Sequence, residues 1–290
     1  MLTDAHCHPF DMTSFFPEFE TERRRLGVIA AASACFKHDF AHNEDLSRNA
    51  VLENAPALLP CFGIHPQIFK IRNQQIAENR EQRIITRELL KGSDEEFDFN
   101  SMLEALELLA SEKRIAAVGE CGFDLFNIAF RETEALQNHF FAAQLEIAFR
   151  YELPIVLHVR RAIHKIFAIS SLLAKCKAVV FHSWGGTFEE AHALLKHGVN
   201  AYFSFGNTIM LNHKHAIRSC ALLPTDRLLT ETDAPYQPRR GETFSQWADL
   251  PLILETAASI RNKAGNKTSK EELEILIEDN FMKAFGRIIE

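Results

Sequence analysis

The segment Pro154-Ile-Val-Leu-His158 is a short apolar run that ends on a histidine. The segment Val179-Val-Phe-His182 repeats this arrangement a little further along the chain. Six residues of metal-ligand type stand where an apolar run stops, and they are His6, His8, Glu120, His158, His182 and Asp233. Such residues at the ends of several strands indicate a fold that brings strand ends together at one point.

Eight runs have the composition of β-strands, and most of them are nearly continuously apolar, which is typical of parallel strands buried on both faces. They are Leu2–Ala5, Val28–Cys35, Leu58–Ile64, Ile115–Gly119, Pro154–Leu157, Ala178–Phe181, Ala201–Phe205 and Leu228–Thr232. Between them lie segments in which apolar residues recur at helical spacing. The helices that this spacing predicts are Ser101–Ala110, Leu136–Phe149, Ile163–Ala174, Glu189–Lys196, Ile209–Leu222, Leu252–Ile260 and Leu273–Phe285.

Repeated strand-then-helix order predicts an α/β protein, and eight strands within 290 residues favour a closed (β/α)8 TIM barrel. The main alternative is an open doubly wound sheet, but the chain lacks the Gly-x-Gly-x-x-Gly turn that such a sheet uses to bind dinucleotides. We expect a single barrel domain over residues 1–290 with a charged insertion around residues 67–100. Within the insertion we expect a helix around Gln74–Leu90, followed by an exposed acidic loop.

Composition excludes some classes of protein. A net charge of −7 argues against a protein that coats nucleic acid through a basic surface, although an enzyme can still contact a few phosphates locally. The six cysteines are far apart, so we expect buried small hydrophobes rather than a disulfide framework. The first motif starts at Asp4, and no apolar run is long enough to span a bilayer. We therefore expect a soluble, cytoplasmic protein with no membrane partner.

His6 and His8 are two residues apart, so on a strand both imidazoles face the same side and can chelate one ion. The last predicted strand lies next to the first in a barrel. Asp233, at the end of that last strand, is therefore expected beside the two histidines.

His158 and His182 end neighbouring strands and are expected to surround a second ion. Glu120 lies between the two sets, and its carboxylate has two oxygens that can bridge two ions. Two ions about 3.5–4 Å apart would polarise a phosphoryl or carbonyl oxygen and activate a shared water. Asp233 would then accept the proton of that metal-activated water, which makes Asp233 and Glu120 the candidate catalytic residues.

Six motifs carry these residues along the chain. They are Asp4-Ala-His-Cys-His8, Gly63-Ile-His-Pro66, Val118-Gly-Glu-Cys-Gly-Phe-Asp124, Leu153-Pro-Ile-Val-Leu-His-Val-Arg160, Phe181-His-Ser-Trp-Gly-Gly186 and Glu231-Thr-Asp-Ala-Pro-Tyr236. In content and order the motifs resemble the TatD-like metal-dependent deoxyribonucleases, a branch of the amidohydrolase-type barrels. The resemblance covers nearly the whole chain and implies a TIM barrel of the metallo-dependent hydrolase type.

The resemblance also implies a ligand set and a reaction. One divalent ion would be held by His6, His8, Glu120 and Asp233, and a second by Glu120, His158 and His182. Imidazole-rich ligation favours Zn, Mn, Co or Fe, whereas Mg prefers oxygen ligands. The implied reaction is hydrolysis of phosphodiester bonds in a DNA substrate, as a 3'-5' exodeoxyribonuclease.

Further residues are expected around the metals. By resemblance, His65 is a substrate-binding residue, and Arg160 suits a phosphate clamp because guanidinium matches phosphate geometry. Asp4 and Asp124 are expected to orient ligand histidines. Trp184 has two candidate roles, stacking a base or packing within its loop.

The chain departs from the usual residues of that family in three loops, namely 125–127, 183–186 and 237–240, where substrate contacts are expected. The altered loops and the acidic charge leave open a hydrolase of a small-molecule ester, lactone or amide with the same two metals. A third alternative is a non-catalytic scaffold that keeps its metals for stability.

Overall fold

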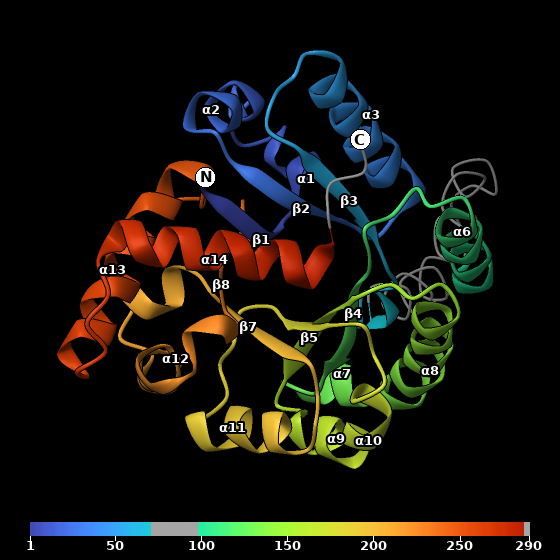
Figure 1. Cartoon of the computed structure of the whole chain (residues 1–290). Helices are drawn as coiled ribbons and strands as arrows, with labels where there is room; N and C mark the ends of the chain where they lie inside the picture. The colour runs from blue at the N-terminus through green and yellow to red at the C-terminus, as the bar shows by residue number, and fades with distance from the viewer. Residues whose placement is uncertain (71–97, 287–290) are drawn as a thin grey trace.

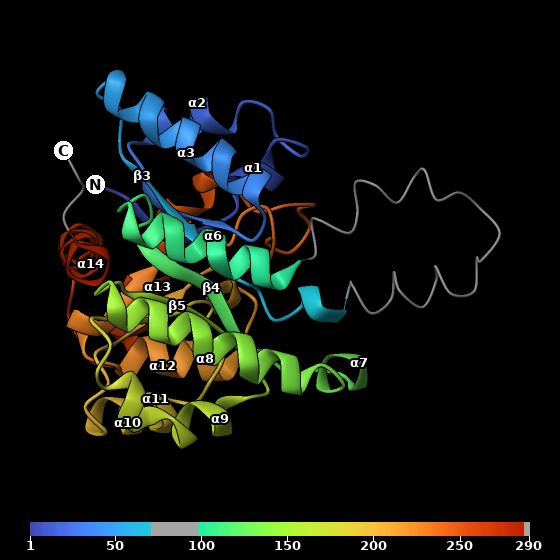
Figure 2. The same ribbon diagram turned by 90° about the vertical axis from the view of Figure 1, so that its right-hand side faces the viewer.

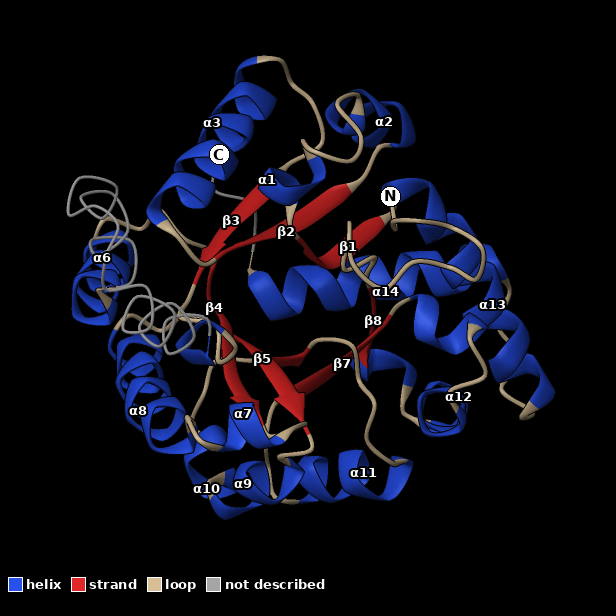
Figure 3. Cartoon of the chain, turned by 180° about the vertical axis from the view of Figure 1, so that it is seen from behind, coloured by secondary structure: helices blue, strands red, loops and turns tan. Residues whose placement is uncertain are grey.

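The computed structural model describes residues 1–70 and 98–286. Within these ranges, eight parallel strands form one sheet in the order β1 to β8, each hydrogen-bonded to the next. Their bounds are β1 Thr3–Cys7, β2 Ile29–Ala34, β3 Leu58–Phe62, β4 Ala117–Asp124, β5 Ile155–Arg160, β6 Val179–Phe181, β7 Ala201–Phe205 and β8 Leu228–Thr230. Figure 3 shows the strands as a ring enclosed by helices, so the predicted (β/α)8 barrel is confirmed.

The ring closes between β8 and β1. The hydroxyl of Thr230 donates to the carbonyl of Thr3 at 2.9 Å. Beyond the end of β8, the backbone N–H of Asp233 donates to the carbonyl of His6 at 2.9 Å, and that of His8 donates to Ala234 at 2.7 Å. These bonds bring the last motif of the sequence against the first.

Helices form the outer layer, except that α14 lies across one end of the barrel (Figure 1). Their bounds are α1 Pro9–Met12, α2 Phe19–Leu26, α3 Lys37–Leu52, α6 Phe99–Ser111, α7 Ile128–Arg131, α8 Glu134–Arg150, α9 Ile163–Ala168, α10 Ser170–Leu173, α11 Phe188–Lys196, α12 Lys214–Leu222, α13 Leu250–Lys263 and α14 Lys270–Phe285. Short 3-10 turns are η2 Asn207–Met210, η3 Thr225–Arg227 and η4 Trp247–Asp249. The helix predicted over 209–222 divides into η2 and α12, because Asn212 between them has a φ of 60°, which no right-handed helix contains.

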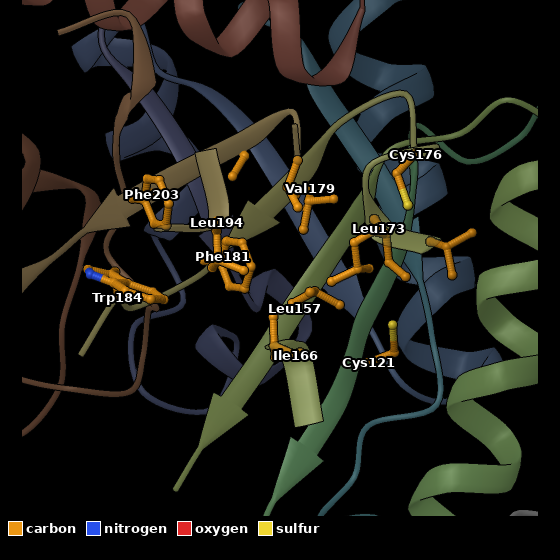
Figure 4. Close-up of a cluster of buried hydrophobic side chains, with 14 of the residues drawn as sticks. Cys121, Leu157, Ile166, Leu173, Cys176, Val179, Phe181, Trp184, Leu194 and Phe203 are labelled. Carbon is orange, nitrogen blue, oxygen red and sulfur yellow. The ribbon is translucent and has the colours of Figure 1, made fainter. Parts of the chain in front are cut away.

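Side chains alternate across the barrel wall. Val156 and Val180 face the interior, where Phe281 and Phe285 of α14 close one end. Leu157 and Phe181 face outward and pack in the layer between strands and helices (Figure 4). Because neighbouring residues of a strand face opposite sides, the histidine that follows each outward residue faces the interior.

Strand β4 is longer than predicted. The sequence predicted its end at Gly119, which would place Glu120 at the strand end. Instead β4 continues to Asp124 with an irregular register between Val118 and Cys121, so Glu120 lies inside the strand. The continuation depends on Gly122, because a Cβ there would lie 2.2 Å from the carbonyl oxygen of His158.

The structure also bears on the cysteines and on membrane-spanning helices. All six cysteines are free, as predicted. In the described part of the chain, no helix is both long enough and apolar enough to cross a bilayer. The helix predicted around residues 74–90 and the acidic loop after it lie outside the described residues.

Gly122→Ala is expected to destabilise the barrel by roughly 3 kcal/mol or more, because β4 must separate from β5. The matched control is Gly27→Ala, since Gly27 also has a positive φ (70°) but has open space around it. The control is expected to lose only about 1–2 kcal/mol, the cost of the left-handed conformation. Urea unfolding of both variants measures the difference, and equal losses would contradict the close approach of the two strands.

Candidate metal centre

The predicted ligand residues gather at one end of the barrel. In Figure 2, α14 covers the opposite end, and the arrow of β4 points away from it. A cavity of about 1090 Å³ opens at this end, and its lining includes His8, Glu120, His158, His182 and Asp233. The site therefore occupies the carboxyl ends of the strands, where barrel enzymes carry their active sites.

Glu120 stands at the centre, and its two oxygens face different imidazoles. Oε2 lies 3.1 Å from Nε2 of His6 and 3.8 Å from Nε2 of His8. Oε1 lies 2.7 Å from Nδ1 of His158 and 2.9 Å from Nε2 of His182. The side chain is only 2% exposed, so these imidazoles replace water as its partners.

Asp233 completes the group on the Oε2 side. Its Oδ1 lies 3.6 Å from Nε2 of His6 and 3.4 Å from Nε2 of His8. One donor atom from each of these three residues lies within 4.8 Å of the others. Residues that are 225 or more positions apart in sequence thus meet, as the closure of β8 on β1 requires.

His65 lies beside Glu120 and His158. Its Nε2 is 3.3 Å from Oε1 of Glu120 and 3.3 Å from Nδ1 of His158. With Glu120 and His158 it forms a further candidate metal-binding group.

Each of three imidazoles has an oxygen beside its second nitrogen. Ser33 Oγ lies 3.1 Å from Nδ1 of His6. The Oδ2 of Asp124 lies 3.2 Å from Nε2 of His158, and Oε1 of Glu231 lies 3.6 Å from Nδ1 of His182. The oxygens of Ser33 and Asp124 are within hydrogen-bond distance, and such partners fix the orientation of a ligand imidazole. Asp124 therefore lies where the sequence predicted, next to a ligand histidine.

Asp4 differs from that expectation, because its partners are Thr232 and the backbone of His6 rather than an imidazole ring. Its carboxylate accepts the hydroxyl of Thr232 at 2.6 Å and the backbone N–H of Thr232 at 3.0 Å. It also accepts the backbone N–H of His6 at 3.2 Å. Asp4 thus ties the segment after β8 to β1 at the level of the site.

The buried Glu120 carboxylate and the imidazoles around it shift each other's pKa values. Burial alone would raise the pKa of Glu120, but His182, His65 and His6 hold it well below its usual value. Burial would likewise lower the pKa of His182, but Glu120 and then Glu231 raise it well above its usual value. The carboxylate and the imidazole therefore stabilise each other's charged forms in the metal-free protein.

The same residues fit divalent metal. The Nε2 atoms of His6 and His8 are 3.1 Å apart, and Nδ1 of His158 is 3.4 Å from Nε2 of His182. Two imidazole lone pairs at such distances require a proton or a cation between them. Several imidazoles with two carboxylates form a donor set suited to Zn, Mn or Co. Candidate metal-binding groups thus lie on both sides of Glu120.

Two predicted substrate contacts have different positions. Arg160 is 48% exposed, lines the cavity, and its Nη1 lies 4.0 Å from Oδ2 of Asp124. The suggestion that Trp184 stacks a base is wrong. Its ring is 3% exposed, packs against Phe203 in Figure 4, and donates through Nε1 to Ser219.

Sequence reasoning missed three residues of the site: Ser33, Glu231 and Gln237. For Glu231 a signal was present, because it is buried two residues before Asp233 in an acidic motif. Gln237 donates through Nε2 to Oδ2 of Asp233 at 2.5 Å, and nothing in its local sequence pattern indicates that bond.

Known proteins resemble this chain over most of its length. The family described as TatD related DNase matches residues 3–286. A Citrobacter rodentium protein named 3'-5' ssDNA/RNA exonuclease TatD is 33% identical over 192 residues, covering 63% of this chain and 70% of that protein. An uncharacterized metal-dependent hydrolase of Mycoplasma pneumoniae is 33% identical over 268 residues, covering 89% and 91%.

A solved structure has the same fold. It is the TatD homologue YJJV of Escherichia coli K12, which superposes with a TM-score of 0.77 at 24% identity and covers 99% of this chain and 98% of its own. The family match spans the strands that carry every predicted ligand. The chain therefore belongs to the TatD related DNase family.

Proposed function

We propose that this chain is a metal-dependent hydrolase that cleaves phosphodiester bonds of DNA, as a 3'-5' exonuclease. The observation that carries the proposal is the Glu120 carboxylate, whose two oxygens face separate sets of ligand-type side chains. Family membership supports the reaction class, and the relative from Citrobacter rodentium bears the name of a 3'-5' ssDNA/RNA exonuclease. This support favours a nuclease over a hydrolase of small-molecule esters, lactones or amides.

The proposed cofactors are two divalent ions. The ligands assigned to the first are His6, His8, Glu120 and Asp233, and those assigned to the second are Glu120, His158 and His182. Such a pair polarises a phosphoryl oxygen and lowers the pKa of a water molecule. Glu120 would hold both ions, because each of its two carboxylate oxygens faces a different set of imidazoles.

Asp233 accepts the proton of the attacking water in this proposal. Burial alone would raise its pKa, but the hydrogen bond with His8 and the nearby imidazoles hold the pKa below its usual value. The carboxylate is therefore ionised at neutral pH and able to receive a proton. His65, 3.3 Å from Glu120, is assigned to the substrate phosphate.

Arg160 supplies local positive charge to an acidic chain. Its guanidinium carbon lies 3.8 Å from the ring centroid of Phe126, and that of Arg161 lies 5.1 Å from the same centroid. Both arginines line the cavity. We assign Arg160 to the phosphate backbone of the bound strand, since a guanidinium held on a ring keeps its N–H groups free for phosphate.

Metal removal tests the function directly. EDTA is expected to abolish 3'-end shortening of a 5'-labelled single-stranded DNA, and Zn, Mn or Co to restore it. Asp233→Asn is expected to lose about 100-fold or more in kcat, because the amide cannot accept a proton, and this loss of activity should exceed its loss of bound metal. Gel electrophoresis of the labelled strand and elemental analysis measure the two effects. Full activity of metal-free protein would contradict the proposal.

Metal affinity is expected to rise with pH. Burial lowers the pKa of His158, but Asp124 and Glu120 raise it above its usual value, and that of His182 is also raised. A protonated imidazole cannot bind metal, so affinity increases by about tenfold per pH unit for each proton displaced. Calorimetric titration with Zn between pH 6 and 8 measures this slope, and an affinity independent of pH would contradict it.

The same shifts predict the stability of the metal-free protein. The raised pKa values of His158 and His182 add to the free energy of unfolding. This stabilisation is complete below the unfolded pKa of about 6.5, and it is lost as pH rises through the raised pKa of the folded protein. The melting temperature of apo protein should therefore fall from pH 6 to pH 8, whereas that of metal-loaded protein should not.

Arg160→Gln is expected to raise KM for DNA about tenfold with little change in kcat, because a phosphate contact made equally in the ground state and the transition state contributes to binding alone. Arg48→Gln is the matched control, since Arg48 is an exposed arginine on α3. Steady-state kinetics of both variants decide the assignment. Equal KM values for the Arg160→Gln and Arg48→Gln variants would show that Arg160 does not contact the substrate.

A further inference from the structure

A hydrogen-bond network joins the loops that follow β6 and β8. Ser183 Oγ donates to Oε1 of Gln237 at 3.0 Å, and Nε2 of Gln237 donates to Oδ2 of Asp233 at 2.5 Å. The backbone N–H of Ser183 donates to Oε1 of Glu231 at 2.7 Å. The network thus runs from one side of the metal centre to the proposed proton acceptor.

The backbone at the network residues is unfavourable on its own. Ser183, Asp233 and Gln237 have φ values of 46°, 54° and 54°, although none of them is glycine. Residues held in the left-handed region persist only where the surroundings determine their conformation, and they concentrate at functional sites. The side chain of Asn207 fixes the Gln237 backbone, because its Nδ2 donates to the Gln237 carbonyl at 3.1 Å.

The hydrogen bond from Gln237 fixes the orientation of the Asp233 carboxylate. Gln237 occupies Oδ2, so Oδ1 is the oxygen that faces Nε2 of His8 at 3.4 Å. The carboxylate is 10% exposed, so little water is available to replace the amide. Without this donor the carboxylate can rotate about its Cβ–Cγ bond and exchange its two oxygens.

We propose that Gln237, held by Ser183, is a positioning residue that keeps Oδ1 of Asp233 directed at the His6–His8 pair and at the metal this pair would hold. The inference rests on the proposed function, and it adds to that function two residues outside the ligand set. The amide at position 237 suits this role, because it donates to a carboxylate through Nε2 and accepts from a hydroxyl through Oε1.

The test uses full-length protein loaded with Co(II). Gln237→Met keeps the length of the side chain and removes both the donor and the acceptor. The expected results are an altered visible absorption spectrum of bound Co(II), about 10–100-fold weaker binding of one ion, and a lower kcat with KM nearly unchanged. Gln237→Glu, which places a second carboxylate against Asp233, is expected to have larger effects in the same direction. Ser111→Ala, an exposed serine of α6, is the control and should match the wild type.

Ser183→Ala tests whether Ser183 acts on Asp233 through its hydrogen bond to Gln237. If the hydroxyl acts through Gln237, the single variant has a smaller loss, and the double variant Ser183→Ala/Gln237→Met is no worse than Gln237→Met alone. Losses that multiply in the double variant would overturn this link. Wild-type Co(II) spectrum, metal affinity and kcat in both Gln237 variants would overturn the proposal itself.

The metal measurements need no DNA, so they test the positioning role of Gln237 independently of nuclease activity. A protein that binds Co(II) as expected and responds to Gln237→Met, but cleaves no DNA, supports the positioning role and rejects the exonuclease. The melting temperature of the metal-free variants identifies any general loss of folding, which would lower both affinities and leave kcat per loaded site unchanged.

Discussion

Burying the Glu120 carboxylate would be unfavourable without positive charge or donors around it, and the mouth of this barrel is arranged to supply them. Four imidazoles lie within 3.3 Å of its oxygens, and they come from β1, β5 and the segments after β3 and β6. No local segment of chain can provide such a set. Placing four imidazoles around Glu120 therefore depends on the whole ring, because strands far apart in sequence must end at the same level.

The fold meets this requirement through strand alternation and closure. Val156 and Val180 face the interior, so His158 and His182, two positions later, face it as well. On the other side, the bond from the Asp233 N–H to the His6 carbonyl sets the end of β8 against β1. Asp4 secures the same junction through Thr232. The site is thus a consequence of barrel packing, and its side-chain network adds the final orientation of each ligand.

Sequence predicted the barrel and the convergence of the ligand-type residues, because apolar runs and the residues that end them are local patterns. It placed Glu120 at a strand end, whereas β4 continues to Asp124, since the effect of Gly122 depends on the neighbouring strand. It also missed the hydrogen bonds of Gln237, and it left open a base-stacking role for Trp184, whose ring is buried. Side-chain hydrogen bonds and ring burial depend on contacts between loops, and these contacts have no signature in the residues themselves.

We propose that the Glu120 carboxylate holds two cations, one at each of its oxygens. The most direct measurement is the number of ions bound per chain, determined by elemental analysis of metal-saturated protein after gel filtration, for wild type and Glu120→Gln. Two ions are expected in the wild type and almost none in the variant, because the neutral amide offers one oxygen and no charge. A wild type that binds a single ion, or a variant that retains two, would contradict it.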